Sequence, residues 1–193
     1  TKPKNTRQLD LFSELVDGFE GDISFANSAA IMNMKKYKKK YKWNNNGKIW
    51  IRPGIALYGI SPLSGISSEQ LNLRAVMTFK SKLISIKNIS KGESVGYNST
   101  WIAKNETKVG TVSVGYGDGY SKSLKSGTPV LVNNKNIPLI GLVSMDLINV
   151  DLNDLSECSI GDEVILWGEE LPIEKVAEKS GLSAYSLATG ITE

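Results

Sequence analysis

Ile51-Arg52-Pro53-Gly54-Ile55-Ala56-Leu57-Tyr58-Gly59 is the stretch around which the chain is organised. The preceding Lys48-Ile49-Trp50-Ile51 predicts a short buried strand, and Pro53-Gly54 ends it sharply. An arginine at the end of a buried strand needs an anionic or acceptor partner, because an unpaired buried charge is costly. The glycine beyond it leaves backbone N–H groups open to a close ligand such as a phosphate. Taken alone, the stretch favours a structural pairing of Arg52 with a carboxylate.

The first 60 residues alternate between helix and strand patterns. A helix around residues 10–19 is predicted to carry its apolar residues on one face, namely Leu11, Phe12, Leu15, Val16 and Phe19. A strand at 23–26 follows, and Asn27-Ser28 suits the N-cap of the next helix, where the helix start is either a plain cap or an anion site. With the strand at 49–57, this alternation is typical of a parallel sheet. Two strands do not make a stable parallel sheet, so we expect earlier strands in a longer protein.

The lysine-rich run Lys35–Lys42 holds six lysines, with Tyr37 and Tyr41 between them. Basic residues with interleaved aromatic rings can contact RNA or an anionic surface. A solvated helix face running into the loop at 44–47 is the simpler interpretation. We therefore expect no nucleic-acid partner and no membrane contact through this run.

After a boundary at residues 61–65 the pattern changes to many short strands. Strand-like runs occupy residues 75–79, 83–86, 109–114, 130–132, 137–140, 147–150 and 164–167. Turn signals separate them at Ser90-Lys91-Gly92, Asn133-Asn134 and Ile160-Gly161-Asp162. This spacing predicts a β-sandwich or a β-barrel. A short helix between Pro172 and Gly181, and one more helical turn at 183–188, close the region.

Composition excludes several classes of site. The 193 residues contain no histidine and one cysteine, Cys158, so the chain cannot build a His/Cys metal site, a Ser-His or Cys-His dyad, or an internal disulfide. A lone cysteine suits a reducing compartment. The net charge of +3 is too weak to imply a nucleic-acid partner, and the chain has no long apolar run of the kind that spans a membrane. Acid–base chemistry must therefore fall to Tyr, Lys, Asp or Glu, or to a cofactor.

Two tyrosines lie beside glycines in the β-rich region. Tyr97 follows Gly96, and Tyr116 stands between Gly115 and Gly117. Such glycines allow tight turns that leave the phenols accessible. Each tyrosine taken alone is better explained as a residue at the edge of the core whose hydroxyl bonds a backbone group.

The motifs taken together resemble a known family. Phe25–Ala30, Arg52–Gly59, the two tyrosine motifs and Ser144–Asp146 occur in the order found in the C-terminal half of alanine racemases, which are bacterial pyridoxal-phosphate enzymes. The resemblance covers nearly the whole chain and implies an α/β plus β fold. Residues 1–62 would be the last two βα units of a (β/α)8 barrel, and residues 63–193 a mainly β, barrel-like domain.

The resemblance also implies a function. Family members are cytoplasmic isomerases that interconvert L- and D-alanine for cell-wall synthesis. They are head-to-tail homodimers, and each active site borrows residues from the other subunit's β-domain. Pyridoxal 5'-phosphate would be the cofactor and alanine the small amino-acid substrate, and no metal is expected.

The cofactor contacts implied by the resemblance lie in the first 60 residues. Ser28 matches the phosphate-binding serine, and Gly54 and Ile55 match the positions whose backbone N–H groups hold the phosphate. Arg52 matches the arginine that faces the pyridine nitrogen. Because arginine stays protonated, that nitrogen should stay unprotonated, which weakens the ring as an electron sink and favours reprotonation at Cα over transamination.

The catalytic contacts implied by the resemblance lie in the β-rich region. Tyr97 matches the tyrosine that exchanges the Cα proton on one face, opposite the cofactor lysine of the barrel's first strand. Tyr116 resembles a second tyrosine at the site entrance. Met145 resembles the residue whose backbone N–H meets the substrate carboxylate, with Asp146 as adjacent support.

The sequence departs from the family pattern at several positions. Ser24 stands where a histidine usually bonds the cofactor arginine, so we expect Arg52 to be held less firmly. Lys122 and Leu142 replace arginines, and no lysine lies in the cofactor-lysine motif. We therefore expect this chain alone to be inactive.

Three alternatives stay open at this point. A serine racemase of the same family differs only by pocket discrimination, which is worth about 1–3 kcal/mol. A non-catalytic β-domain that binds or dimerises is the second alternative. A surface binder acting through Lys35–Lys42 is the third.

Overall fold

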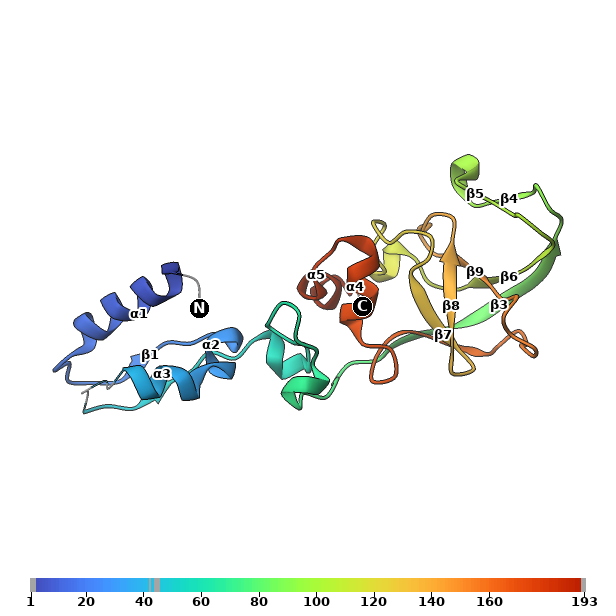
Figure 1. Ribbon diagram of the computed structural model, residues 1–193. Helices are drawn as coiled ribbons and strands as arrows, with labels where there is room; N and C mark the ends of the chain where they lie inside the picture. The colour runs from blue at the N-terminus through green and yellow to red at the C-terminus, as the bar shows by residue number, and fades with distance from the viewer. Residues whose placement is uncertain (1–2, 42, 44–45, 192–193) are drawn as a thin grey trace. The chain divides into compact units, whose positions relative to one another are not determined.

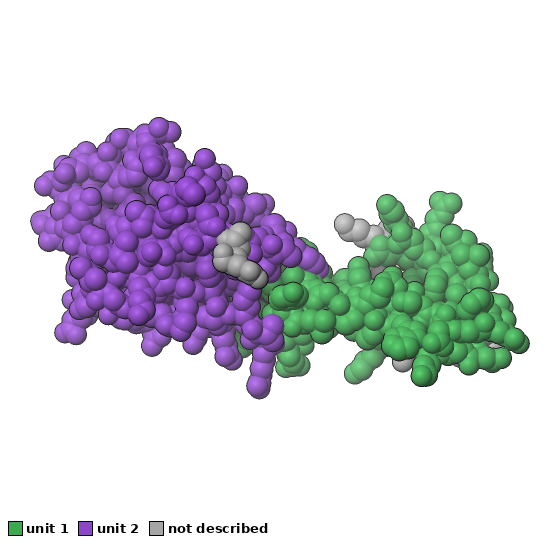
Figure 2. All heavy atoms as spheres, turned by 180° about the vertical axis from the view of Figure 1, so that it is seen from behind, with its two compact units in different colours: residues 1–73 green, residues 74–193 purple. Residues whose placement is uncertain are grey.

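The computed structural model describes residues 3–41, 43 and 46–191. The chain divides into two compact units, residues 1–73 and 74–193, which are coloured separately in Figure 2. Within the described residues, each helix is too short or too polar to cross a membrane.

The first unit alternates helices with two short strands (Figure 1). Its elements are α1 (Pro3–Val16), β1 (Ile23–Ser24), α2 (Ser28–Met32), α3 (Met34–Lys40), β2 (Ile49–Trp50), and the 3-10 turns η1 (Ile55–Tyr58) and η2 (Glu69–Leu71). β1 and β2 pair in parallel, with Ile23 opposite Ile49. The predicted alternation and the parallel pairing are both confirmed.

An aspartate locks this parallel pair in register. The two carboxylate oxygens of Asp22 accept hydrogen bonds from the Lys48 N–H and from the Trp50 indole Nε1–H, each at 2.8 Å. The indole and then the backbone N–H lower the pKa of the Asp22 carboxyl below its ordinary value. Two charge-assisted hydrogen bonds to one side chain, one from Lys48 just before β2 and one from Trp50 within it, compensate for strands of only two residues.

Burial in the first unit differs from the sequence prediction. β2 was predicted to be buried, but Ile49 and Trp50 are 41% and 55% exposed. The reason is that β1 is its only hydrogen-bonded strand among the described residues. The apolar face predicted for α1 also divides: Val16 is buried, whereas Leu11 and Leu15 are 56% and 70% exposed. The described elements of this chain therefore cover only part of the apolar face of α1.

The lysine-rich run forms α3 and its C-terminal end, and its tyrosines face the protein. Tyr37 is buried, and the Tyr41 hydroxyl donates a 2.6 Å hydrogen bond to Asp10. The solvated helix face is confirmed for Lys35, Lys36, Lys39 and Lys40, which are all exposed. Part of the run and its loop, residues 42, 44 and 45, lies outside the described residues.

The second unit is a closed antiparallel β-barrel (Figure 1). Its strands follow the order β10-β3-β6-β9-β8-β7, formed by β3 (Phe79–Ile89), β6 (Thr107–Val112), β7 (Pro129–Val132), β8 (Lys135–Ile140), β9 (Ile148–Asp151) and β10 (Glu163–Trp167). Fully buried side chains fill its interior: Val109, Val112, Val130, Ile137, Leu139, Ile148, Val150, Val164 and Leu166. The predicted barrel is thus confirmed, and closure leaves no open sheet edge among its six strands.

Turns and helices of the second unit follow the sequence signals closely. The β7–β8 hairpin turns at Asn133-Asn134, both in the left-handed region with φ of 48° and 60°, as a two-residue hairpin requires. The helices α4 (Ile173–Ser180), which ends at Gly181, and α5 (Ala184–Thr189) stand where they were predicted.

Two features of the second unit differ from the prediction. The run at 75–79 is not a strand: β3 begins at Phe79, which is the last residue that β10 pairs with, and Val76 is 69% exposed. The short hairpin of β4 (Ser94–Val95) and β5 (Trp101–Ile102) was not predicted. Strands of two residues are too short to show the alternation that marks a strand in a sequence.

Candidate active site

Ser28 organises a cradle at the carboxyl ends of β1 and β2. Asn27 caps α2 by accepting a 3.1 Å hydrogen bond from the Ala30 N–H, which places Ser28 at the first helical position. The Ser28 hydroxyl is buried and accepts from the Gly54 N–H at 2.9 Å and the Ala56 N–H at 3.2 Å. Because its oxygen accepts twice, its proton stays available to donate to an anion.

The backbone beyond Arg52 leaves one amide open. Of the two amides predicted to hold a phosphate, the Gly54 N–H is already bonded to Ser28, whereas the Ile55 N–H has no acceptor among the described residues. A methyl group built on Gly54 would meet nothing within 4 Å, so the cradle is open on that side. The Ser28 hydroxyl and the Ile55 N–H form a donor set that suits a phosphate oxygen. The role of Ala56 was not predicted, and no sequence signal distinguishes this alanine.

Arg52 is bound to a neutral group. Its backbone N–H donates to the Ala26 carbonyl at 2.9 Å, which extends the parallel ladder beyond β2. Its Nη1 donates to the Ser24 hydroxyl at 2.9 Å. The ion pairs among the described residues join other side chains, so the carboxylate partner suggested by the opening stretch is absent there. Ser24 reaches the guanidinium and leaves its positive charge uncompensated, while the expectation that Arg52 is held less firmly than by a histidine stays a prediction.

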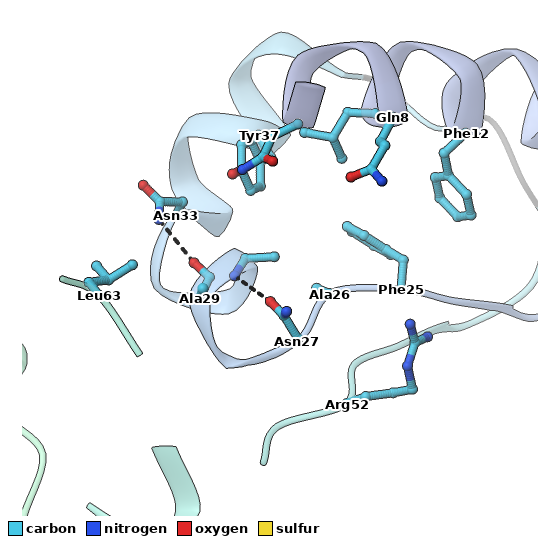
Figure 3. A pocket seen from close by; sticks show the side chains of 13 residues that line it. Gln8, Phe12, Phe25, Ala26, Asn27, Ala29, Asn33, Tyr37, Arg52 and Leu63 are labelled. Atoms are coloured by element: carbon cyan, nitrogen blue, oxygen red, sulfur yellow. Dashed lines mark hydrogen bonds between the residues drawn. The ribbon is translucent and has the colours of Figure 1, made fainter. Parts of the chain in front are cut away.

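A pocket of about 580 Å³ adjoins this guanidinium (Figure 3). Figure 3 shows the segment of Phe25 and Ala26 between Arg52 on one side and Phe12 and Tyr37 on the other. Phe12 and Phe25 pack with ring centroids 5.4 Å apart. Of the predicted site residues, Arg52 is the one that lines this pocket.

Tyr97 stands on an exposed turn in the second unit. The turn η3 (Tyr97–Ser99) connects β4 to β5, and Tyr97 is 68% exposed. Gly96 has φ of 77°, and Asn98 and Ser99 also adopt left-handed φ values of 58° and 48°. Asparagine tolerates this region, whereas Ser99 is strained there by about 1 kcal/mol or more. This strain is typical of a turn shaped for a functional side chain.

The Tyr116 turn rests on the chain around Met145. η4 (Tyr116–Asp118) is held by hydrogen bonds from the Tyr116 N–H to the Ser144 carbonyl at 2.9 Å and from the Gly117 N–H to the Met145 carbonyl at 2.8 Å. Met145 is 57% exposed, and its own N–H has no acceptor among the described residues. That amide is open to an acceptor such as a substrate carboxylate, and its binding role stays a prediction. A methyl group built on Gly117 would lie 3.6 Å from Oδ1 of Asp146, so Asp146 flanks the same turn.

Lys122 lies over the face of Tyr116. Its Nζ is 5.4 Å from the ring centroid, which is within the range of a cation–π interaction. Lys122 stands where the resembling family usually has an arginine. The lysine keeps a positive charge beside the phenol.

The predicted residues thus form two groups, one in each unit. The first comprises Ser28, Arg52, Gly54 and Ile55, and the second comprises Tyr97, Tyr116, Met145 and Asp146. Each group joins residues that are distant in the sequence. The first offers a cation with hydrogen-bond donors, and the second offers phenols with an open amide.

Comparisons with known proteins identify the family of the chain. A family model described as "Alanine racemase, C-terminal domain" matches residues 76–193. The alanine racemase of Vibrio vulnificus strain CMCP6 is 44% identical over 186 residues, which cover 96% of this chain and 49% of the relative. That of Aliivibrio salmonicida is 42% identical over 98% of this chain and 51% of the relative. The chain therefore spans about half the length of the curated relatives it matches.

Solved structures give the same result for the fold. The biosynthetic alanine racemase of Pseudomonas aeruginosa superposes with a TM-score of 0.90 at 41% identity, over 100% of this chain and 51% of that chain. The alanine racemase of Bartonella henselae, solved with covalently bound pyridoxal phosphate, gives a TM-score of 0.81 at 28% identity, over 100% and 51%. Because the family model covers more than half of its residues, the chain belongs to the alanine racemase C-terminal domain family.

Proposed function

We propose that this chain forms part of a pyridoxal-phosphate-dependent alanine racemase, to which it contributes the phosphate cradle, the arginine for the pyridine nitrogen and the catalytic tyrosine. The observation that carries the proposal is the hydrogen bond of Arg52 to Ser24. A guanidinium held by a neutral hydroxyl keeps its charge available for a ligand, whereas a structural ion pair would have used it.

The first unit binds and orients the cofactor. The Ser28 hydroxyl and the Ile55 N–H hold the phosphate, beside Gly54, whose lack of a side chain keeps the approach open. Arg52 would lie at the pyridine nitrogen and would keep it unprotonated, because arginine does not release its proton. Pyridoxal phosphate supplies the electron sink that makes the substrate Cα proton acidic. By keeping that nitrogen unprotonated, Arg52 would favour return of the proton to Cα over transamination.

The second unit supplies one of two bases. Tyr97 moves the Cα proton through its phenolic oxygen on one face, and a lysine outside this chain acts on the other face. Inversion at one carbon requires bases on opposite faces. The Met145 N–H binds the substrate carboxylate, while Tyr116 narrows the entrance and Asp146 supports the turn.

The active protein is a cytoplasmic homodimer in this proposal. Residues 1–62 complete a (β/α)8 barrel, and residues 63–193 form the β-domain that serves the partner's site. The exposure of Tyr97, Tyr116 and Met145, at 68%, 43% and 57%, supports a second subunit that covers these side chains.

The test compares the full-length protein with this chain alone. Purified full-length protein with pyridoxal phosphate is expected to convert L-alanine to D-alanine faster than it converts L-serine, as measured by chiral chromatography. The isolated chain is expected to show no conversion, because it lacks a cofactor lysine. Racemisation by the isolated chain would refute the shared two-base site, and a preference for serine would move the assignment to a serine racemase.

A further inference from the structure

One short segment, Gly141–Met145, contacts both tyrosine-bearing turns. At its start, a methyl group built on Gly96 would lie 3.6 Å from the Leu142 nitrogen, and one built on Gly141 would lie 3.0 Å from the Val95 carbonyl oxygen. The chain that leads into Tyr97 therefore lies directly against this segment. At its end, the segment accepts the two hydrogen bonds that hold the Tyr116 turn. Any displacement of the segment would move both tyrosines.

A single serine hydroxyl fixes the start of this segment. The Ser126 hydroxyl accepts a 2.9 Å hydrogen bond from the Gly141 N–H and donates a 3.2 Å hydrogen bond to the Gly141 carbonyl. Gly141 follows β8 directly and has φ of 74°, so the chain leaves the barrel here in a conformation that favours glycine. The side chain of Ser126 is thus hydrogen-bonded to both the N–H and the carbonyl of Gly141, the first residue of the segment.

We infer that Ser126 is a positioning residue that sets the place of Tyr97 and Tyr116 through the segment Gly141–Met145. This inference rests on the proposed racemase function. Tyr97 stands on a strained turn that is open to solvent. The Ser99 hydroxyl donates a 2.9 Å hydrogen bond to the Ser94 hydroxyl within the same hairpin, so the place of the whole turn depends on the backbone against which it packs. The turn packs through Gly96 on the segment Gly141–Met145, and the hydrogen bonds of Ser126 fix the position of this segment.

Replacement of Ser126 is expected to change the isotope effects for the two alanine enantiomers in opposite directions. Ser126→Ala removes two hydrogen bonds of ordinary strength and is expected to lower kcat/KM for alanine about two- to tenfold. Because the two enantiomers have equal free energy, kcat/KM must fall equally in both directions, and rates alone cannot reveal the cause. The Cα-deuterium isotope effect can, since Tyr97 removes the proton from only one enantiomer. Misplacement of Tyr97 should raise the isotope effect for that enantiomer and lower it for the other.

The experiment uses the full-length protein with pyridoxal phosphate. Wild type, Ser126→Ala and Ser126→Thr are compared for isotope effects with both deuterated alanines, and Thr, which keeps a hydroxyl, is expected to restore the wild-type values. Ser123→Ala is the matched control. Ser123 lies in the same loop as Ser126, and its hydrogen bond to Ser121 is made by its backbone N–H, which the substitution keeps. Amide hydrogen exchange gives a second readout: Tyr116 and Gly117 are expected to exchange faster in Ser126→Ala, while β10 does not change.

The outcomes separate this inference from the proposed function. An active wild type with opposite changes of the two isotope effects in Ser126→Ala, reversed in Ser126→Thr, supports the inference. Equal isotope effects in all variants, or unchanged exchange at Tyr116 and Gly117, overturn it while the racemase assignment stands. A wild type without racemase activity overturns both. If Ser126→Ala does not fold, Ser126→Cys, which keeps the size and weakens the hydrogen bonds, undergoes the same test.

Discussion

The hydroxyl of Ser24 accepts a 2.9 Å hydrogen bond from Nη1 of Arg52 and links the end of β1 to a residue two positions beyond the end of β2. A hydroxyl orients the guanidinium without neutralising it. A carboxylate at the same place would hold Arg52 more tightly but would compete with any anionic ligand. The neutral partner is therefore consistent with an arginine that serves a cofactor.

Replacing Ser24 tests this support. Ser24→Ala in the full-length protein is expected to lower alanine racemisation about two- to fivefold, because one exposed hydrogen bond to Arg52 is lost. A looser guanidinium also lets the pyridine nitrogen gain a proton, so the fraction of turnovers that yield pyruvate should rise. Pyruvate formation is measured with a coupled dehydrogenase assay. Ser24→Thr retains the hydroxyl and should behave like wild type; equal pyruvate formation in Ser24→Ala and wild type would contradict this role.

Asp22 makes the first unit sensitive to acid. The Trp50 indole N–H and the Lys48 N–H lower the pKa of the Asp22 carboxyl below 3.8. A lowered folded-state pKa stabilises the fold above the unfolded-state pKa, and this contribution is lost as the pH falls through the folded-state value. The NMR signal of the Trp50 indole proton should therefore shift with a midpoint below 3.8. Asp22→Asn should remove that titration, whereas the control Asp17→Asn should keep it. A midpoint above 3.8 would contradict the role of the two hydrogen bonds that Asp22 accepts.

Tyr120 makes the barrel sensitive to alkali. Its hydroxyl is fully buried and has no hydrogen-bond partner among the described residues, and its ring stacks on Trp167 with centroids 5.9 Å apart. Burial raises the pKa of this phenol above its ordinary value of 10. Above pH 10 the unfolded chain releases the proton while the folded chain retains it, so stability falls as the pH rises.

The corresponding variant is Tyr120→Phe. Its free energy of unfolding at pH 7 is expected to be about 1 kcal/mol higher than that of wild type, because the substitution removes an unsatisfied buried hydroxyl. Above pH 10 the variant is expected to lose less stability than wild type. Urea unfolding followed by circular dichroism measures both effects. Tyr185→Phe, at a residue that is 47% exposed, is the control. A loss of stability in Tyr120→Phe at pH 7 would show that the hydroxyl has a partner after all.

Lys122 is expected to orient the Tyr116 ring. Lys122→Met keeps a long apolar chain and removes the charge 5.4 Å from the ring centroid, so the cation–π contribution of about 0.5–1 kcal/mol is lost. The KM for alanine in the full-length protein should rise about two- to fivefold. Lys122→Arg should restore it, since arginine also stacks on aromatic faces. An unchanged KM in Lys122→Met would assign the lysine to the solvated surface.

Local patterns predicted most of the fold. The barrel strands at residues 83–86 and 130–132 stand out because they are short runs rich in aliphatic residues between clear turn signals, and Asn133-Asn134 marks the hairpin that follows the second run. The exposure of Ile49 and Trp50 was not predictable, because burial depends on which elements lie beside a strand in space. The β4–β5 hairpin was missed because two-residue strands carry no period.

The candidate site was only partly accessible from the sequence. Ser28 and Arg52 follow strand ends, a position that sequence patterns reveal. Ala56 and Ser126 act through geometry: one offers a backbone N–H to Ser28, and the other bonds both backbone groups of Gly141. Neither residue type carries a signal of that role, so only the structure reveals them.

The most direct measurement is the interconversion of L- and D-alanine by the full-length protein carrying Tyr97→Phe. Removal of one hydroxyl from an exposed side chain should leave the fold and the absorbance of the bound cofactor unchanged. The account predicts that racemisation falls by at least about a hundredfold, the usual contribution of a positioned acid–base group, while Tyr41→Phe stays active. Racemisation at the wild-type rate by Tyr97→Phe would contradict the assignment of Tyr97 as the base.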